Sequence, residues 1–399
     1  MRRQAFLWLL LLLGLLCMAG CGTEQEAAAQ VLNLTDVPMT ETQARQLQEL
    51  ALTEALEYQE YIAQVGPSET ANLTLQQEQI VRVVQLFADR GRTVVDAENH
   101  CSMENPEPAR NFGRAVQRGE DASLVCYRIY ADGGFSRSEF VCRNGAASLT
   151  NVRVAWDNSL TPQVVSVSKR DLPELRYTEK GYLIYRMREL DSVVTGPDYV
   201  PYQMIRVEPL DDTCRELCST YIRPAGYANH NLFLTDWSQE DYGELVWNDL
   251  FPVCYFLETG TLLTSHQCAG YSFSASSGLL IPAEDYGRYI GCYFAIDPAE
   301  LERRSYRDPD SGCYPTRIFT SGDMSRRLPV PEVVAWNRNA DGTLTLTVEA
   351  LDVESGTDCA FSHQVTVLPR DGGGWYYLAN QLLCAESGQL PAYENPYPD

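Results

Sequence analysis

Apolar residues recur every three or four positions between Thr40 and Gly66, the spacing that places them on one face of a helix. Thr40 and Gln43 form a capping-box pattern at the start, and Gly66 with the proline that follows ends the element. A second stretch of the same kind begins at Thr74 and ends at Gly91. We therefore expect two helices near the start of the chain, each with one buried face. Their apolar positions are Leu47, Ala51, Ala55, Tyr58, Ile62, Val65, Ile80, Val84 and Phe87.

From Ser123 onward the spacing changes to every second residue, which is typical of strands. Asn144-Gly145, between two such runs, is the signal of a two-residue hairpin turn. The runs follow one another with short polar links, so we expect an antiparallel meander. The expected strands cover residues 124–130, 136–143, 149–156, 163–167, 175–177 and 182–187.

Two cysteines lie on the first pair of these strands. If the turn after residue 130 closes as a three-residue loop with Asp132 opposite Ser136, Cys126 faces Cys142 on the neighbouring strand. That register would allow a cross-strand disulfide. Two buried thiols without a bond are the alternative.

The middle of the chain mixes the two patterns. Ser238 predicts the start of a short helix that runs to about Leu250. Pro282 predicts another that runs to about Tyr293, and Asp297 followed by proline begins a third. The first two share the run Glu-Asp-Tyr-Gly near their start. Acidic residues suit any first helical turn, so this match is weak support for an internal duplication.

Strands return near the end of the chain. Leu344, Leu346 and Val348 alternate with threonines, so one face of this sheet should be buried and the other wet. The links between the strands are rich in Asn, Asp and Gly, as hairpin turns are. The expected strands cover residues 333–336, 343–351, 360–368 and 375–382.

Together these elements predict an α+β fold with two modules. Residues 39–205 should hold N-terminal helices followed by an antiparallel β-meander. Residues 206–389 should form a second, mixed module that ends in another antiparallel β-meander. Residues 390–399 contain three prolines and are expected to be a loose tail.

Residues 1–20 have the pattern of a lipoprotein signal peptide, with two arginines followed by an apolar run. That run is too short for a bilayer, which needs ~20 residues. Its end, Met18-Ala19-Gly20-Cys21, resembles the lipobox of bacterial lipoproteins, whose cysteine thiol receives a diacylglycerol before the chain is cut. We therefore expect acyl chains such as palmitate on Cys21, a flexible linker over residues 21–38, and a location on the extracytoplasmic face of the cell membrane. An ordinary secretory signal with a chance cysteine is the alternative.

The net charge limits which partners the chain can bind, and the cysteine content limits which disulfides it can form. Removing residues 1–20 takes away two arginines and no acid, so the net charge of −23 becomes −25. Such an acidic surface disfavours nucleic acid. Of the 13 cysteines, Cys17 leaves with the signal and Cys21 carries lipid, and the odd remainder cannot all pair. An exported chain permits disulfides, yet many of these cysteines lie in apolar runs, where a thiol behaves as a small hydrophobe.

Several runs in the second half have a distinctive composition. They are Trp247-Asn248-Asp249-Leu250, Ile281-Pro282-Ala283-Glu284, Thr343-Leu344-Thr345-Leu346-Thr347-Val348, Phe361-Ser362-His363-Gln364-Val365-Thr366-Val367 and Trp375-Tyr376-Tyr377-Leu378-Ala379-Asn380. These runs resemble uncharacterised clostridial (Firmicute) surface lipoproteins of unknown function. The resemblance implies a class and a location and carries no known activity.

Two patterns could hold a metal, and each has a simpler interpretation. The run from Asn337 to Gly342 resembles the start of a calcium loop, but Val348 stands where the closing glutamate is needed. A hairpin turn explains it better. Cys214 and Cys218 would share one helical face, but zinc needs four ligands, usually in two close pairs. Buried or disulfide-linked cysteines are the simpler interpretation, so we expect no metal site and no cofactor.

Nucleophilic catalysis has one weak candidate. Asp358, Cys359 and His363 could form a thiol site, but His363 alternates with Phe361 and Val365 as a strand residue would. The chain has no phosphate-cradling glycine loop and no Gly-x-Ser-x-Gly or His-Glu-x-x-His motif. We therefore expect no catalytic residue.

These observations predict a non-catalytic, lipid-anchored cell-surface protein that binds an envelope component or another partner, whether protein, peptide or glycan. Its membrane contact would be the lipid on Cys21. A solute-binding lipoprotein of a transporter is an alternative, although such proteins need repeated β-α-β units and the strands here are grouped in runs. A cell-envelope hydrolase is the second alternative, but so acidic a sequence does not single out the carboxylate pair it would need.

Overall fold

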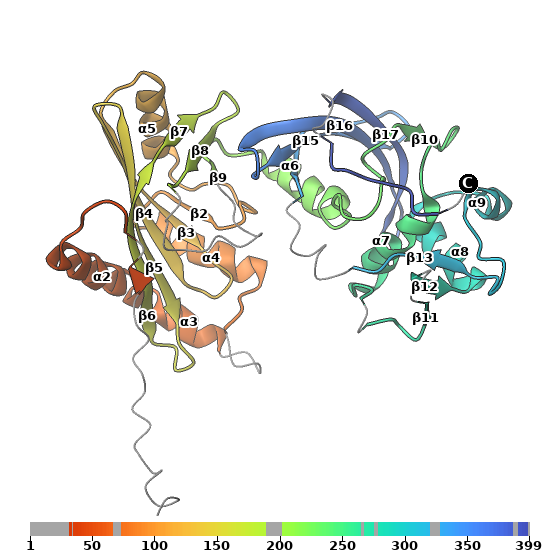
Figure 1. Cartoon of the computed structure of the whole chain (residues 1–399), viewed down its shortest axis with the longest axis horizontal. Coiled ribbons are helices and arrows are strands. Elements are labelled where there is room, and N and C mark those ends of the chain that lie inside the picture. The colour runs from red at the N-terminus through yellow and green to blue at the C-terminus, as the bar shows by residue number, and fades with distance from the viewer. Residues whose placement is uncertain are drawn as a thin grey trace, which may run out of the picture.

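The computed structural model shows two lobes, one that contains the described elements up to β9 (Tyr202–Arg206) and one that contains the described elements from α6 (Asp212–Leu217) onward (Figure 1). The expected α+β class is confirmed, because helices and mainly antiparallel sheets are combined in each lobe. The structure describes residues 32–33, 35–66, 73–188, 202–264, 267–274, 278–319, 328–385 and 390–397.

The N-terminal lobe is built, in the part of the chain that the structure describes, on a six-stranded sheet in the order β1-β6-β5-β4-β3-β2. Strands β3 to β6 form four of the six strands of the expected antiparallel meander; the other two, 175–177 and 182–187, belong to a separate small sheet instead. Strands β1 and β2 extend the two edges in parallel pairs that the sequence pattern did not indicate. The strands are β1 (Leu32–Asn33), β2 (Val94–Asp96), β3 (Ala122–Ile129), β4 (Phe135–Arg143), β5 (Ala146–Trp156) and β6 (Pro162–Leu172).

Both faces of this sheet are covered. Helices α2, α3 and α4 enclose one core, which contains Phe135 and Val154. Helix α5 and a small sheet of β7, β8 and β9 enclose a second core on the other face, which contains Phe140 and Leu149. Successive strand residues point to opposite faces, so each strand supplies two cores. The covering elements are α2 (Glu41–Leu56), α3 (Gln59–Val65), α4 (Gln77–Ala88), α5 (Glu107–Gln117), β7 (Glu174–Tyr177), β8 (Tyr182–Arg186) and β9 (Tyr202–Arg206).

The first helix starts as predicted. Thr40 Oγ1 accepts the N–H of Gln43 at 3.2 Å, and the Gln43 side chain accepts the N–H of Thr40 at 2.9 Å. The helical stripe is divided between α2 and α3, which meet at Tyr58. The second predicted helix starts later than Thr74, because Gln76 and the side chain three residues on form its capping box. Helix α5 lies in a stretch for which the pattern predicted no element.

The predicted pairing of Cys126 with Cys142 is wrong. Cys126 lies opposite Ser138, and Cys142 lies opposite Ala122. The loop has three residues, as expected, but it lies two residues earlier, between Tyr130 and Gly134. The two thiols share a sheet face four residues apart, roughly 13 Å at ~3.3 Å per residue, whereas a disulfide needs Cα atoms within about 7 Å. Both cysteines are free and buried.

Gly133 decides this register. Its φ of 72° lies in the left-handed region, which a three-residue hairpin loop needs at its last position. Its carbonyl oxygen accepts the Tyr58 hydroxyl and the Trp156 indole N–H, both at 2.9 Å. The loop is therefore fixed from α2–α3 and from β5 as well as by its own turn.

The C-terminal lobe contains a five-stranded sheet in the order β10-β17-β16-β15-β14. One face packs against helices in a single large core, and the alternation predicted for β15 is confirmed: Leu344, Leu346 and Val348 are buried while the residues between them are partly exposed. A three-stranded sheet of β11, β12 and β13 lies beside the helices (Figure 1). The strands are β10 (Trp237–Ser238), β11 (Ser272–Ser274), β12 (Gly278–Ile281), β13 (Tyr314–Thr316), β14 (Val330–Arg338), β15 (Leu344–Asp352), β16 (Thr357–Pro369) and β17 (Trp375–Ala385).

The helices of this lobe match the predictions in part. Those expected after Pro282 and Asp297 are present as α8 and α9, but the helix expected from Ser238 is absent. Ser238 ends β10, and its Oγ accepts the N–H groups of residues 240 and 241 in a turn that continues through Gly243 at a φ of 53°. The helix starts instead at Trp247. The helices are α6 (Asp212–Leu217), α7 (Trp247–Thr259), α8 (Ala283–Tyr293), α9 (Pro298–Arg304) and the π-helix η1 (Cys218–Ile222).

The shared run Glu-Asp-Tyr-Gly therefore adopts two structures, a turn before α7 and the first turns of α8. It gives no support to an internal duplication. Within the described ranges, every helix is too short or too polar to cross a lipid bilayer.

Candidate ligand-binding groove

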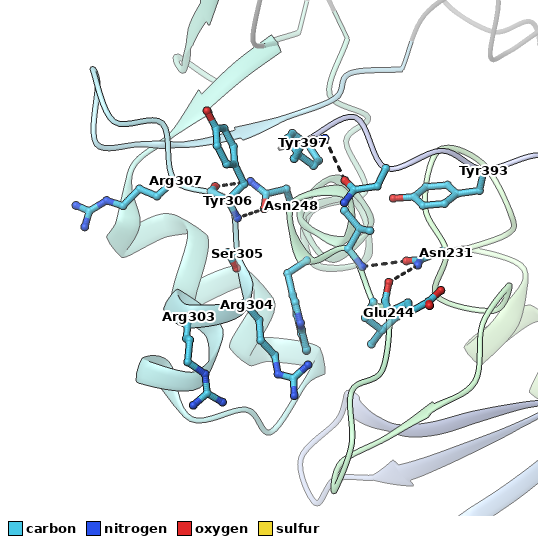
Figure 2. Close-up of a pocket in the computed structure, with 14 residues that line it drawn as sticks. Asn231, Glu244, Asn248, Arg303, Arg304, Ser305, Tyr306, Arg307, Tyr393 and Tyr397 are labelled. Carbon is cyan, nitrogen blue, oxygen red and sulfur yellow. Dashed lines mark hydrogen bonds between the residues drawn. The ribbon is translucent and has the colours of Figure 1, made fainter. Parts of the chain in front are cut away.

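A groove of about 670 Å³ opens in the C-terminal lobe (Figure 2). Three segments line it: residues 244–248 at the start of α7, residues 303–307 at the end of α9, and residues 393–397. Figure 2 shows Tyr306, Tyr393 and Tyr397 along one side and the side chains of Arg303 and Arg304 on the other. The groove thus combines aromatic rings, guanidinium groups and amides.

Two buried asparagines hold the first two segments. Asn248 donates from Nδ2 to the carbonyl of Tyr306 at 2.9 Å, and its Oδ1 accepts the N–H of Tyr306 at 2.9 Å. Asn231 donates to the carbonyl of Glu244 at 2.7 Å and accepts the N–H of Val246 at 3.1 Å. These side chains satisfy backbone groups that would otherwise be buried without partners, as a neighbouring strand would. They fix irregular backbone in place and leave the side chains of the walls to face a ligand.

Helix α9 delivers the arginines. Asp297 caps it by accepting the N–H groups of the second and third residues at 2.9 and 3.2 Å. Arg303 and Arg304 occupy its last turn, where a positive charge suits the helix dipole, and both pair with Glu300. The Arg303 side chain is 70% exposed, so this ion pair is readily exchanged for a ligand.

The third wall is anchored by a buried carboxylate. The Asp249 side chain has no exposed surface. It accepts the hydroxyl of Tyr393 at 2.7 Å and that of Tyr397 at 2.8 Å, and it forms an ion pair with Arg317. Arg317 also lies over the Tyr393 ring, 5.2 Å from its centre, and donates to the carbonyl of Glu394. Three side chains therefore depend on one carboxylate: Arg317, Tyr393 and Tyr397.

The prediction of a loose tail over residues 390–399 is wrong for residues 390–397, the part of it that the structure describes. Leu390 packs against the core, and the two tyrosine hydroxyls bind Asp249. Burial, together with the Asp249 charge, raises the pKa of Tyr393 and of Tyr397, so both phenols remain donors. Prolines limit the conformations of the unfolded segment, which lowers the entropy cost of ordering it.

The groove offers binding contacts more readily than reaction chemistry. Both oxygens of Asp249 are occupied by donors of the chain itself. The Tyr306 and Tyr397 rings are stacked 6.0 Å apart, which presents a flat apolar surface between polar groups. Across the described ranges, no group of three or more His, Cys, Asp or Glu side chains is placed to hold a metal ion. Such a combination suits recognition of a partner with both polar and ring-like surfaces.

The other predicted site residues lie elsewhere. Cys21 is outside the described residues. Cys214 and Cys218 are buried free thiols, and the Cys218 thiol donates to the carbonyl of Pro331. The run starting at Asn337 forms the hairpin turn between β14 and β15, as expected.

His363 is a strand residue, as its spacing indicated, and it is fully buried. Its Nδ1 contacts Asn380 Oδ1 at 2.8 Å, and its Nε2 contacts the Tyr227 hydroxyl at 3.0 Å. Burial lowers the pKa of His363 to about 4. The nearby Cys359 thiol donates to a backbone carbonyl instead of to this ring, so the two do not form a nucleophile pair.

Sequence reasoning did not identify the groove. Asn231, Asn248 and Asp249 are polar residues with no motif around them, and their partners are distant in the chain. One signal was present: tyrosines at 393 and 397 are large side chains that a loose tail has no need of. Aromatic residues in a proline-rich end segment therefore favour docking onto the fold.

The fold and the groove define a two-lobed α+β protein with an open polar and aromatic groove on its second lobe. The chain belongs to a family of unknown function, DUF6070, whose model matches residues 42–396. This agrees with the expected relationship to an uncharacterised family. Comparison with the curated proteins gave no match, and comparison with the solved structures gave none either.

Proposed function

We propose that this chain is a non-catalytic lipoprotein, anchored through Cys21 on the extracytoplasmic face of the cell membrane, that binds a peptide or glycan chain of an envelope partner in the groove of its C-terminal lobe. The observation that carries the proposal is the groove itself, about 670 Å³ in volume and lined by tyrosines, arginines and amides on a rigid frame.

The shape and chemistry of the groove support an extended ligand. It is bounded by segments from three distant parts of the chain and is open to solvent (Figure 2). Stacked tyrosines suit sugar rings or aromatic side chains, and guanidinium groups suit the carboxylates common in both kinds of polymer. The arginines already have their own acidic partners, so the ligand need not be highly charged.

The groove is tested by thermal unfolding of the full chain in a non-ionic detergent with cell-wall fragments, oligosaccharides and short peptides. A bound ligand at ~100 times its dissociation constant adds about 2.7 kcal/mol to the free energy of unfolding, which raises the melting temperature. Tyr306→Ala should abolish the shift while sparing the Asn248 contacts, because those use the backbone of Tyr306. Tyr61→Ala, in the N-terminal lobe, is the matched control. A shift unchanged in Tyr306→Ala would contradict the groove as the binding site.

The anchor is tested separately in a bacterial host that processes lipoproteins. The wild-type chain should incorporate labelled palmitate, lose residues 1–20 and partition into detergent. Cys21→Ser should do none of these, whereas Cys17→Ser should leave the labelling intact. Equal labelling of the wild type and Cys21→Ser would refute the anchor.

A further inference from the structure

A second cavity, of about 210 Å³, lies where the two lobes meet. Arg128 and Gln203 line it from the N-terminal lobe, and Arg223 and Glu332 line it from the C-terminal lobe. A separate pocket of about 10 Å³ shares Arg223 and Glu332 with this cavity and is also lined by Arg215. Two arginines, one from each lobe, thus line the cavity and a third lies in the small pocket beside it, in a chain whose net charge is −23.

Glu332, one of the carboxylates that line this cavity, is already neutralised by the chain itself. Glu332 is 6% exposed and forms a bidentate ion pair with Arg206, whose Nε lies 2.9 and 3.1 Å from the two oxygens. The Tyr182 hydroxyl donates to the same carboxylate. Arg206 and Tyr182 come from the first lobe, so this cluster joins the lobes and uses up the charge of Glu332.

The three remaining arginines form no ion pair with any carboxylate that the structure describes. Arg128 donates only to neutral groups, the Tyr185 hydroxyl at 2.9 Å and the Gln203 amide oxygen at 3.4 Å. Arg215 donates to a serine hydroxyl and a backbone carbonyl.

Two of these guanidinium groups keep buried donors without partners. Arg215 Nη2 and Arg223 Nε are shielded from solvent and make no hydrogen bond. Burial lowers the pKa of Arg215, because its charge has lost hydration. Unpaired buried charge costs several kcal/mol, so guanidinium groups without counter-ions beside a cavity point to an anion from outside the chain.

The nearby acids do not fill this role. Both oxygens of Asp96 accept backbone N–H groups, those of His100 and Cys101, at 2.7 Å. Glu98 lines the cavity but is exposed and forms no ion pair that the structure describes. The cavity therefore has donors in excess of acceptors.

We propose that this cavity between the lobes is a binding site for a small anion that carries a carboxylate or phosphate group, held between Arg128 of the first lobe and Arg223 of the second. Guanidinium groups present planar donor pairs that match the oxygens of both anions. The volume is about seven times the ~30 Å³ that one water molecule occupies in the liquid, which fits inorganic phosphate or a short organic acid. This site is separate from the groove, and its ligand would bridge the lobes.

The test is isothermal titration of the full chain in non-ionic detergent with inorganic phosphate, succinate and citrate, each at constant ionic strength in chloride. We expect saturable binding of at least one anion. Binding of phosphate alone assigns a phosphoryl ligand, and binding of the organic acids alone assigns a carboxylate. Arg223→Gln should weaken binding at least tenfold, and Arg223→Lys should give an intermediate loss, because lysine keeps the charge but not the paired donors.

Controls separate this site from a structural role and from the groove. Arg143→Gln, an exposed arginine without an ion pair in the described residues, should bind as the wild type does. Without anions, Arg223→Gln should melt at the same or a higher temperature than the wild type, since it removes an unpaired charge; a lower melting temperature would indicate a structural arginine and overturn the proposal. Tyr306→Ala should leave anion binding unchanged, so the groove and the cavity can fail independently. Absence of saturable binding at millimolar anion, or wild-type affinity in an Arg215→Gln/Arg223→Gln double variant, would also overturn it.

Discussion

The sheet of the N-terminal lobe is covered on both faces, whereas the sheet of the C-terminal lobe is covered on one. In the first lobe, Phe135 and Phe140 of a single strand enter different cores. In the second lobe, Leu344 and Val348 enter one core while the threonines between them are partly exposed. Regular strands thus define most of the first interior, and the second interior is completed by helices and loops.

This difference decides where a groove can form. Loops need partners for their backbone polar groups, and in the C-terminal lobe Asn231, Asn248 and Asp249 supply them. In the N-terminal lobe, a Cβ added at Gly113 or Gly133 would meet a neighbouring side chain at 2.5 or 2.8 Å. The second lobe should therefore be sensitive to loss of polar groups, and the first to added volume.

The largest expected effect is from Asp249→Asn. It leaves the partly exposed Arg317 without its counter-ion and weakens the acceptor of two tyrosine hydroxyls, which should cost about 3 kcal/mol of the free energy of unfolding. Denaturant unfolding should show this loss, and limited proteolysis should cut residues 390–397 faster than in the wild type. The matched change in the first lobe is Glu54→Gln, because burial raises the pKa of Glu54. It should cost less than about 1.5 kcal/mol. Equal losses would remove the contrast between the lobes.

Glycine substitutions test whether each lobe tolerates added side-chain volume. In Gly113→Ala of α5 the new Cβ would lie 2.5 Å from the Tyr177 ring, and overpacking of this kind costs about 1–3 kcal/mol. In Gly291→Ala of α8 the new Cβ meets nothing within 4 Å. That change should raise the free energy of unfolding by about 0.5–1 kcal/mol, because alanine favours the helix. Denaturant titration measures both, and a destabilised Gly291→Ala would contradict the open helix surface.

The buried histidine of the second lobe predicts a pH dependence. His363 has a pKa of about 4 in the folded state, against ~6.5 when unfolded, so only the unfolded chain takes up this proton between those values. Its contribution is complete above pH 6.5 and is lost as the pH falls toward 4. Between pH 7 and 5 the loss should be about 2 kcal/mol and should disappear in His363→Gln. His100 is an exposed histidine of the first lobe, and His100→Gln should reduce this pH dependence less than His363→Gln does. If the free energy of unfolding of His363→Gln falls with pH as steeply as that of the wild type, the prediction is wrong.

The smallest effect concerns the thiols of both lobes. The buried cysteines of both lobes that the structure describes are free thiols: Cys126, Cys142, Cys214, Cys218 and Cys254. The melting temperature should therefore be the same with and without a reducing agent, as calorimetry would measure. A lower melting temperature after reduction would reveal a disulfide and would require another strand register.

The sequence predicted helix starts and turns correctly where the residues that determine them are close together in the chain. The capping box at Thr40, the Asn144-Gly145 hairpin and the proline start of α9 each depend on residues within four positions of one another. The predictions failed where two local structures compete. Ser238 and Asp241 suit a turn as well as a helix start, and β10 pairing with β17 favoured the turn.

The candidate site was beyond prediction for a different reason. Asp249 meets Tyr393 and Tyr397 across 144 and 148 positions of the chain, and no spacing rule connects residues so far apart. The division at residue 205 and the lipid on Cys21 remain predictions from sequence.

The sequence by itself determined the α+β class, the alternation in the strands and some helix starts, such as those after Thr40 and Asp297, because these depend on neighbouring residues and on the two periods of the backbone. Only the tertiary structure decided which thiols lie opposite each other, where residues 390–397 dock and which arginines share a cavity. Each of these is a contact between distant residues, set by how whole elements pack and by which buried charges must find partners.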